Sequence, residues 1–327
     1  MYATGNKKML NMLILEILRE YTDEDHFLTQ QEIVKLLDKN YGMECDRRSV
    51  KNNILCLQEL GYDISMEKGY RLLSREFDDA ELRILIDCVL FSKSISTKHS
   101  KVLIEKLRGL ASKHFNAKVN HISNLPELRR TENKQTIYSL DAINDAISAK
   151  KKISFTYNNV GMDFRLHPVD DRIRIASPYQ VVANNGRFYL ICNYDNYNNV
   201  IHVRIDKMTD VKVLDDKARP MRELKELSGG LNLPKHMAEH IYMFSGPSVT
   251  VKLKAPMSSF PELVDWFGKD FRIIEKDGEY ITIRLSCNET AIRFWALQFG
   301  PYVEVLEPEG LRNQIRDDIE GMYKKYQ

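Results

Sequence analysis

The fold of the middle of this chain is decided by three stretches, Ser177-Pro178-Tyr179-Gln180, Gly186-Arg187-Phe188-Tyr189-Leu190-Ile191 and His202-Val203-Arg204-Ile205-Asp206-Lys207-Met208. Short apolar runs of this kind, separated by Asn- and Gly-rich turns, are typical of strands. They predict a small β domain that presents Tyr, His, Arg and Lys side chains together on one surface. That set of side chains is unusual for a packing surface and suits the binding of an anion.

The alternation of side chains along a strand separates core residues from candidate site residues. Along residues 187–191, Phe188 and Leu190 share one face, while Tyr189 lies on the other. We therefore expect Phe188 and Leu190 in the core, and Tyr189 in the site. Large aromatic residues are usually buried, so Trp266 and Trp295 are expected in a core or an interface.

The next strand, residues 200–204, places two cationic side chains on one face. His202 and Arg204 lie opposite to Val203. Two such cations need a counter-charge, which Asp206 or Asp195 of the same chain or an external anion can supply. We favour an external anion and expect Asp206 to orient an arginine.

The first 75 residues carry the pattern of three helices and a hairpin. Apolar residues recur at helical spacing over residues 7–21, 29–41 and 46–60. Thr29 with Glu32 forms a capping box, and Asp46 can cap the third helix. Residues 63–72 alternate as a short hairpin with Gly69 near its turn. This order predicts a winged helix-turn-helix.

The exposed face of the third predicted helix has the residues that read DNA. Arg can bind guanine and Asn can bind adenine in the major groove, and cations on the wing can contact phosphates. The candidate DNA-binding residues are Arg47, Arg48, Lys51, Asn52, Lys68 and Arg71. The alternative is an ordinary solvated helix face, because residues 1–73 hold 10 Lys and Arg against 12 Asp and Glu. Phosphate neutralisation supplies much of DNA affinity, so dimerisation would have to compensate.

The rest of the chain divides into three parts. Residues 78–116 have the stripes of two more helices, and residues 116–136 are a polar linker. A helix at 138–149 and closely spaced short strands follow, which predict a small barrel. After residue 218, the order β-α-β-β-α-β is ferredoxin-like. We thus expect an α+β multidomain chain with boundaries at 1–75, 76–135, 136–217 and 218–327.

Several motifs together resemble the WYL-domain transcriptional regulators over the whole chain. The tripeptide that names the family corresponds to Phe188-Tyr189-Leu190, with Phe in place of Trp, and the arginine-bearing motif resembles residues 202–208 with Lys207 in place of a second Arg. Residues 242–246, 265–268 and 299–303 resemble the family's C-terminal WCX extension. Where the family often has Arg-Asp, this chain has Asn52-Asn53, so a DNA target does not carry over.

The resemblance implies a winged helix-turn-helix, an SH3-like or Sm-like WYL barrel that binds an anionic ligand such as a nucleotide or a nucleic-acid fragment, and a WCX domain. The ligand-binding residues that it suggests are Tyr179, Tyr189, His202 and Arg204, then Lys207, with Arg165, His167 and Arg187 widening the basic surface. Our first hypothesis is therefore a homodimeric regulator that binds double-stranded DNA and responds to that ligand; the cysteine usage makes the cytoplasm its expected location. The alternatives are an accessory protein that binds RNA or single strands without promoter specificity, and a purely structural adaptor.

Composition excludes other classes. The chain has 327 residues and a net charge of +2. It lacks an apolar run long enough for a membrane span, and it lacks the motifs of nucleotide-binding loops, zinc proteases and serine hydrolases. Its five cysteines are far apart and form no Cys-x-x-Cys pair, which predicts neither disulfides nor a zinc knuckle. We therefore expect no enzymatic activity, no cofactor and no metal.

Overall fold

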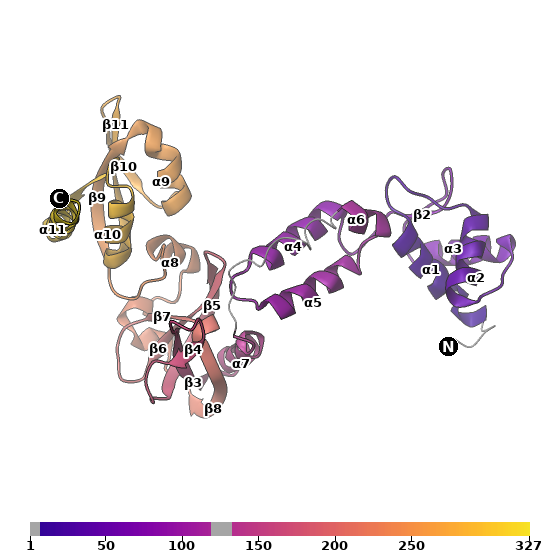
Figure 1. The fold of residues 1–327 in the computed structure, drawn as a ribbon, viewed down its shortest axis with the longest axis horizontal. Helices are drawn as coiled ribbons and strands as arrows, with labels where there is room; N and C mark the ends of the chain where they lie inside the picture. Colours follow the sequence, from indigo (N-terminus) through magenta and orange to yellow (C-terminus); the bar gives the residue numbers. More distant parts are fainter. Residues whose placement is uncertain (1–6, 119–132) are drawn as a thin grey trace. The chain divides into compact units, whose positions relative to one another are not determined.

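The computed structural model describes residues 7–118 and 133–327. The chain divides into two compact units, Met1–Arg130 and Thr131–Gln327. Figure 1 traces the order of their helices and strands along the chain. Part of the predicted linker, residues 119–132, lies outside the described residues. Among the described helices, none combines the length and the apolar character that crossing a membrane requires.

The first unit begins with three helices around one core. They are α1 (Leu10–Tyr21, after a 3-10 turn at Lys7–Met9), α2 (Gln30–Tyr41) and α3 (Arg47–Glu59). The predicted capping box is confirmed, since Thr29 accepts from the Glu32 amide and Glu32 accepts from the Thr29 amide. Asp46 caps α3 by accepting from the Ser49 amide at 2.7 Å. These caps fix where α2 and α3 begin.

A two-stranded hairpin follows α3. Its strands β1 (Ile64–Ser65) and β2 (Arg71–Leu72) are antiparallel, and an isolated bridge joins Leu28 to Tyr70. Gly69 has a φ of +154° in the turn between them, which agrees with the turn that the sequence predicts. Ile64 and Leu72 are buried in the same core as the three helices, so the hairpin is part of this domain.

Three helices, one more than predicted, complete the described part of the first unit. They are α4 (Asp79–Phe91), α5 (Thr97–Arg108) and the short α6 (Lys113–Lys118). Their separate core consists of Leu82, Ile86, Leu90, Ile104, Ala111 and Phe115. On the opposite side of α4, Ile84, Cys88 and Phe91 are exposed.

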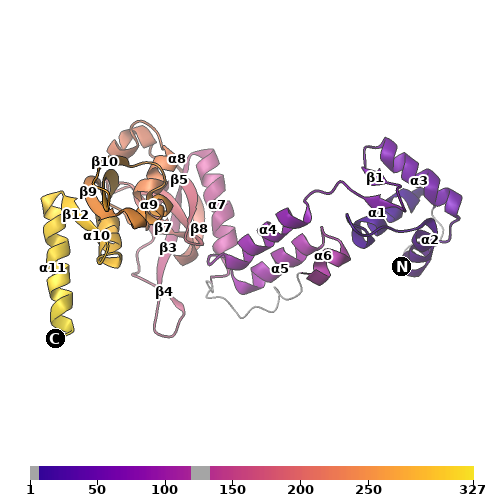
Figure 2. The ribbon, with the colours of Figure 1, turned by 90° about the horizontal axis from the view of Figure 1, so that it is seen from above.

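The second unit begins with α7 (Thr136–Ala149) packed on a curled sheet, as Figure 2 shows. The strands are β3 (Lys151–Val160), β4 (Leu166–Pro168), β5 (Arg174–Asn184), β6 (Arg187–Tyr194), β7 (Ile201–Arg204) and β8 (Met208–Lys217). They follow the order β4-β3-β5-β6-β7, and β8 pairs back onto β3. Leu190 is fully buried in the core, as predicted, and Phe188 packs against that core.

Strand β8 was not predicted from the sequence. Most of its residues are polar and most are exposed, so it lacks the apolar alternation that marks a half-buried strand. Its pairing with β3, for example Ile153 with Val213, brings the end of the sheet back beside its beginning. The strand exists because of this pairing.

A connecting segment covers one face of the curled sheet. It contains two 3-10 turns, Met221–Glu223 and Lys225–Leu227, and the helix α8 (Leu233–Glu239). Leu224, Leu227 and Met243 pack there against Ile191 of β6 in one buried cluster. The face of β6 and β7 opposite to the sheet's own core is therefore partly covered by chain from outside the sheet.

The C-terminal domain has the predicted order of strands and helices. It comprises β9 (Ser248–Pro256), α9 (Phe260–Phe267), β10 (Arg272–Lys276), β11 (Tyr280–Asn288), α10 (Glu289–Gln298), β12 (Glu304–Glu307) and α11 (Glu309–Lys325). The sheet order is β10-β11-β9-β12, with all neighbours antiparallel. Trp295 is 1% exposed in its core, and Trp266 packs against that core.

Candidate ligand and nucleic-acid surfaces

Two arginines on neighbouring strands share one buried carboxylate. Arg204 of β7 binds Asp206 through Nε at 3.0 Å and Nη2 at 2.7 Å, and Arg187 of β6 donates to the same carboxylate at 2.9 Å. Asp206 is 3% exposed, whereas the two arginine side chains keep 29% and 27% of their surface. Asp206 orients two arginines where the sequence predicted one, and it supplies a counter-charge for which we had expected an external anion.

The charges around Asp206 leave a positive excess. Burial alone disfavours the charged form of Arg204, but the hydrogen bonds and charge of Asp206 outweigh it and raise the arginine's pKa. Lys207 donates to Asn159 at 2.7 Å, and burial together with Arg204 lowers its pKa. Three cations therefore surround one acid, and the arginines retain accessible surface for a further anion.

Tyr189 lies on the same strand face as the two arginines. It follows Arg187 by two positions on β6 and pairs with Arg204 of β7, so all three share one face. Burial raises its pKa, although both arginines oppose this. Tyr157 of β3 packs at the edge of the sheet's core, and burial, aided by the charge of Asp206 and opposed by Arg204, raises its pKa. Sequence reasoning missed Tyr157, which stands in a predicted strand with nothing else to mark it.

Tyr179 belongs to a buried cluster against which Tyr189 also packs. It is 5% exposed in the cluster beneath the connecting segment. Its hydroxyl donates to the Arg219 carbonyl at 3.0 Å, and burial raises its pKa to about 12. A buried tyrosine with a satisfied hydroxyl has a sufficient structural role, so we leave Tyr179 out of the site proposed below.

Arg165 and His167 lie on the exposed hairpin of β3 and β4. His167 contacts the Asp163 carboxylate at 2.9 Å, and the hydrogen bond from the Arg165 amide, together with that contact, lowers the pKa of the exposed Asp163. His167 pairs with Asn159, the residue that binds Lys207. Through Asn159, the hairpin is therefore connected to Lys207, one of the three cations around Asp206.

His202 shares the strand face of Arg204, but it lies against two other histidines. Its Nε2 is 2.7 Å from the Nε2 of His236, and its ring centroid is 4.6 Å from that of His240. Burial, with those two neighbours, lowers the pKa of His202 to about 3. It is neutral at neutral pH and adds no positive charge beside Arg204.

The predicted DNA-reading side chains lie on the outer face of α3. Val50, Ile54 and Leu57 are buried, while the opposite face exposes Arg47, Arg48, Lys51 and Asn52. Arg47 donates to Gln31 of α2 at 3.0 Å, and Lys68 is exposed in the hairpin turn. Arg71 instead donates to the Glu24 carbonyl of its own domain.

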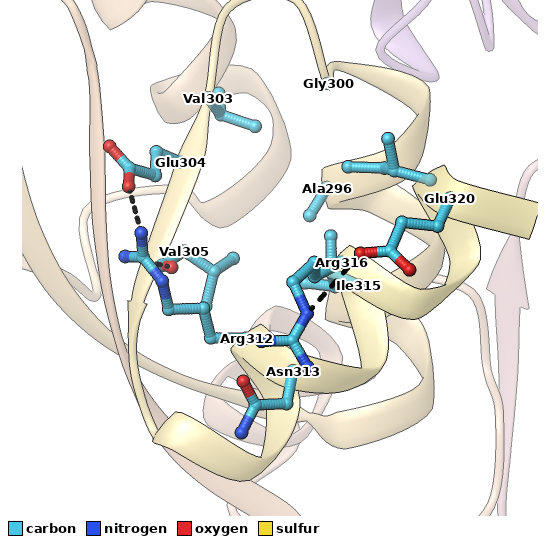
Figure 3. A pocket seen from close by; sticks show the side chains of 11 residues that line it. Ala296, Gly300, Val303, Glu304, Val305, Arg312, Asn313, Ile315, Arg316 and Glu320 are labelled. Carbon is cyan, nitrogen blue, oxygen red and sulfur yellow. Dashed lines mark hydrogen bonds and ion pairs between the residues drawn. The ribbon is translucent and has the colours of Figure 1, made fainter. Parts of the chain in front are cut away.

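A hollow in the C-terminal domain offers a contrast. About 270 Å³ in volume, it is lined by α10, β12 and α11, and includes Arg312 and Arg316 (Figure 3). Arg312 binds Glu304 at 2.6 Å, and Arg316 lies 3.9 Å from Glu320. Each arginine here has its own acid, so this hollow lacks the positive excess found around Asp206.

Comparison with known proteins identifies the two domains of the second unit. The curled sheet with its covering helix, followed by an antiparallel sheet domain, defines a multidomain α+β protein. The WYL domain model matches residues 139–213, and the WCX domain model matches residues 245–323. The chain thus contains a WYL domain followed by a WCX domain.

One curated relative is the "Uncharacterized HTH-type transcriptional regulator YobV" of Bacillus subtilis (strain 168), which is 25% identical over 283 residues, 84% of either chain. Among solved structures, "Proteasome accessory factor B/C (PafBC) of Arthrobacter aurescens" aligns with 98% of this chain at 13% identity and a TM-score of 0.30. This chain spans about half (49%) of its length. A "CRISPR Cas-related protein" aligns with 77% of this chain and 75% of its own at 14% identity and a TM-score of 0.40. TM-scores this low do not establish that either structure shares the fold arrangement of this chain.

Proposed function

We propose that this protein is a DNA-binding transcription regulator whose WYL domain senses an anionic ligand. The observation that carries the proposal is the outer face of α3, where Arg47, Arg48, Lys51 and Asn52 are exposed on a capped helix that is buried on its other side. The relationship to an HTH-type regulator over most of the chain supports it. On this proposal, α1–α3 with the β1–β2 hairpin form a winged helix-turn-helix, and the curled sheet is an SH3-like or Sm-like barrel.

The DNA-binding step can be tested on the full chain with one substitution. Footprinting on genomic DNA should reveal a discrete protected duplex. Arg48→Ala should weaken binding to that duplex by roughly 5- to 150-fold, because a base contact of this kind contributes about 1–3 kcal/mol. Lys101→Ala on α5 removes one exposed charge elsewhere in the same unit and should leave the affinity unchanged. Absence of any protected site would contradict the proposal.

The anion-binding surface that we propose consists of Arg187, Arg204, Lys207, Tyr189 and Tyr157. Two guanidinium groups held on one carboxylate are pre-oriented, and their exposed edges can bind a phosphate. The tyrosine rings can stack on a base. A nucleotide or a short single strand combines both features, and we propose this class as the ligand.

Labelled single-stranded oligonucleotide is the probe for this surface. Arg187→Gln should weaken its binding by roughly 10- to 100-fold, which corresponds to the loss of a charge-assisted hydrogen bond. Arg172→Gln is the matched control, because Arg172 is also exposed in the same domain but lies outside the cluster. Equal affinity of the two variants would remove the ligand site from the proposal.

A second candidate is the accessory protein that binds RNA or single strands without promoter specificity. It is favoured by the acid-rich first 73 residues, with 10 Lys and Arg against 12 Asp and Glu. The same two variants separate the candidates. Tight single-strand binding that depends on Arg187 but not on Arg48, without specific duplex binding, would favour the accessory role.

Dimerisation is part of the proposal, since it would double the DNA contacts of a domain with little net charge. The exposed stripe of Ile84, Cys88 and Phe91 on α4 is the surface that we propose for it; Ile84 is 62% and Phe91 59% exposed. Light scattering should give twice the chain mass of 38.2 kDa, and Phe91→Ser should shift the protein towards the monomer. A monomeric wild type would exclude this part of the proposal.

A further inference from the structure

Three histidines from two separate elements converge at the boundary between β7 and the connecting segment. His202 comes from β7, His236 from α8, and His240 from the position that ends α8. Because His240 follows His236 by four positions, both lie on the same side of the helix. The ring centroids of His236 and His240 are 4.4 Å apart, and the ring centroid of His202 lies within 5.0 Å of each of them. One nitrogen of each ring lies within 4.8 Å of the other two.

The hydrogen bonds of the three rings leave lone pairs available. His240 donates through Nδ1 to the Phe244 carbonyl at 3.0 Å, which fixes the tautomer with a lone pair on Nε2. Such a bond from the other ring nitrogen is the usual outer support of a metal-bound histidine. His202 and His236 point their Nε2 atoms at each other at 2.7 Å. At least one of these two atoms also carries a lone pair, because a single proton can lie between them.

The three histidines are buried or half-buried, which favours the neutral imidazole that binds metals. His240 is 6% exposed, and burial, together with the neighbouring histidines, lowers the pKa of His202 to about 3 and that of His236 to about 4. Burial also lowers the pKa of His240. Neutral imidazole nitrogens are preferred ligands of Zn²⁺ and related divalent transition metals.

We propose that His202, His236 and His240 form a site for a divalent transition metal of the Zn²⁺ class, bound through Nε2 of each ring. Three protein nitrogens leave a fourth position for water or an added ligand. Nitrogens that each lie 2.0–2.1 Å from zinc are about 3.3 Å apart in tetrahedral geometry, so the 2.7 Å contact must open by about 0.6 Å. The bound ion would pin α8 to β7, and so fix the segment that leads from the WYL to the WCX domain.

The other cluster of possible ligands in the described residues does not have this geometry. Asp23, His26 and His114 lie close together, but the two rings are stacked at 3.5 Å and 5°. Lone pairs lie in the ring planes, so parallel stacked rings do not direct them to one point. Asp23 is already engaged by His26, Ser112 and backbone amides. This cluster therefore provides a matched control.

Zinc titration of the full chain tests the site and does not depend on the regulator proposal. After dialysis against a chelator, calorimetry should show one Zn²⁺ bound per chain. His236→Gln should weaken binding by more than about 100-fold, beyond the 10- to 100-fold loss typical of outer partners. His114→Gln and the exposed His167→Gln should leave affinity unchanged. Circular dichroism of each variant checks that it is folded.

X-ray absorption of the zinc-loaded wild type gives a readout that does not rely on a variant. It should show imidazole nitrogens about 2.0–2.1 Å from the ion. His202→Gln should reduce the number of imidazole ligands by one. If no zinc binds to the folded wild type, or if binding survives His236→Gln, the assignment to this trio is overturned.

Discussion

Arg204 binds Asp206 through two nitrogen atoms, at 3.0 Å and 2.7 Å, although only Ile205 separates them in the sequence. The 3-10 turn Ile205–Lys207 makes this possible, because it turns the chain at the end of β7. Asp206 also receives Arg187 from β6. One nearly buried carboxylate thus fixes both arginines of the proposed anion site.

Asp206→Asn should destabilise the second unit. Removing one partner of a buried pair costs about 3–5 kcal/mol, and we expect the lower end because the guanidinium groups remain more than a quarter exposed. Urea unfolding followed by circular dichroism measures the loss. Asp87→Asn breaks the exposed pair with Arg83 and should cost at most about 1 kcal/mol. Equal losses in the two variants would contradict the central role of Asp206.

Asp46→Ala should weaken the domain that holds α3 without removing any of its cations. The carboxylate caps the helix by accepting from the Ser49 amide at 2.7 Å, and loss of an N-cap costs about 0.5–2 kcal/mol. Thermal unfolding of the variant measures this. Asp38→Ala, an exposed change within α2, is the control that should leave stability nearly unchanged. A wild-type melting curve for Asp46→Ala would show that the cap is dispensable.

Gly69→Ala should disturb the hairpin and, with it, DNA binding. Gly69 has a φ of +154°, and a Cβ there would collide with the Phe27 ring and approach the Leu28 carbonyl to 3.0 Å. We expect a loss of about 1–3 kcal/mol from strain and overpacking. Gly310→Ala, where a Cβ meets open space, should change stability by less than about 0.5 kcal/mol. Denaturation midpoints of the two variants decide this.

Acid should destabilise the first unit through Asp23. Burial acts to raise the pKa of this carboxyl, but hydrogen bonds from the His26 side chain and from two backbone amides lower it below its ordinary value of 3.8. Its stabilising contribution is therefore complete above about pH 3.8 and is lost as the pH falls through the lower pKa of the folded state. In unfolding titrations, the difference between wild type and Asp23→Asn should shrink over that range. A difference that does not vary with pH would contradict the bonding seen here.

Local signals in the sequence were strong enough to predict the capped starts of α2 and α3. The cap at Thr29, the left-handed Gly42 that ends α2 and the core position of Leu190 all depend on near neighbours. Strand β8 could not be predicted, because pairing with β3 defines it. The histidine trio joins residues 34 and 38 positions apart. Only the spacing of His236 and His240, four residues, was a local sign of it.

The coupling between ligand and DNA tests the central claim most directly. The full chain is titrated with its footprinted duplex, with and without saturating single-stranded oligonucleotide. We expect the ligand to change duplex affinity by roughly 5- to 150-fold, as allosteric coupling energies of about 1–3 kcal/mol require. The change should vanish in Arg187→Gln and persist in Arg172→Gln. An oligonucleotide that binds the wild type and leaves its duplex affinity unaltered would contradict the account.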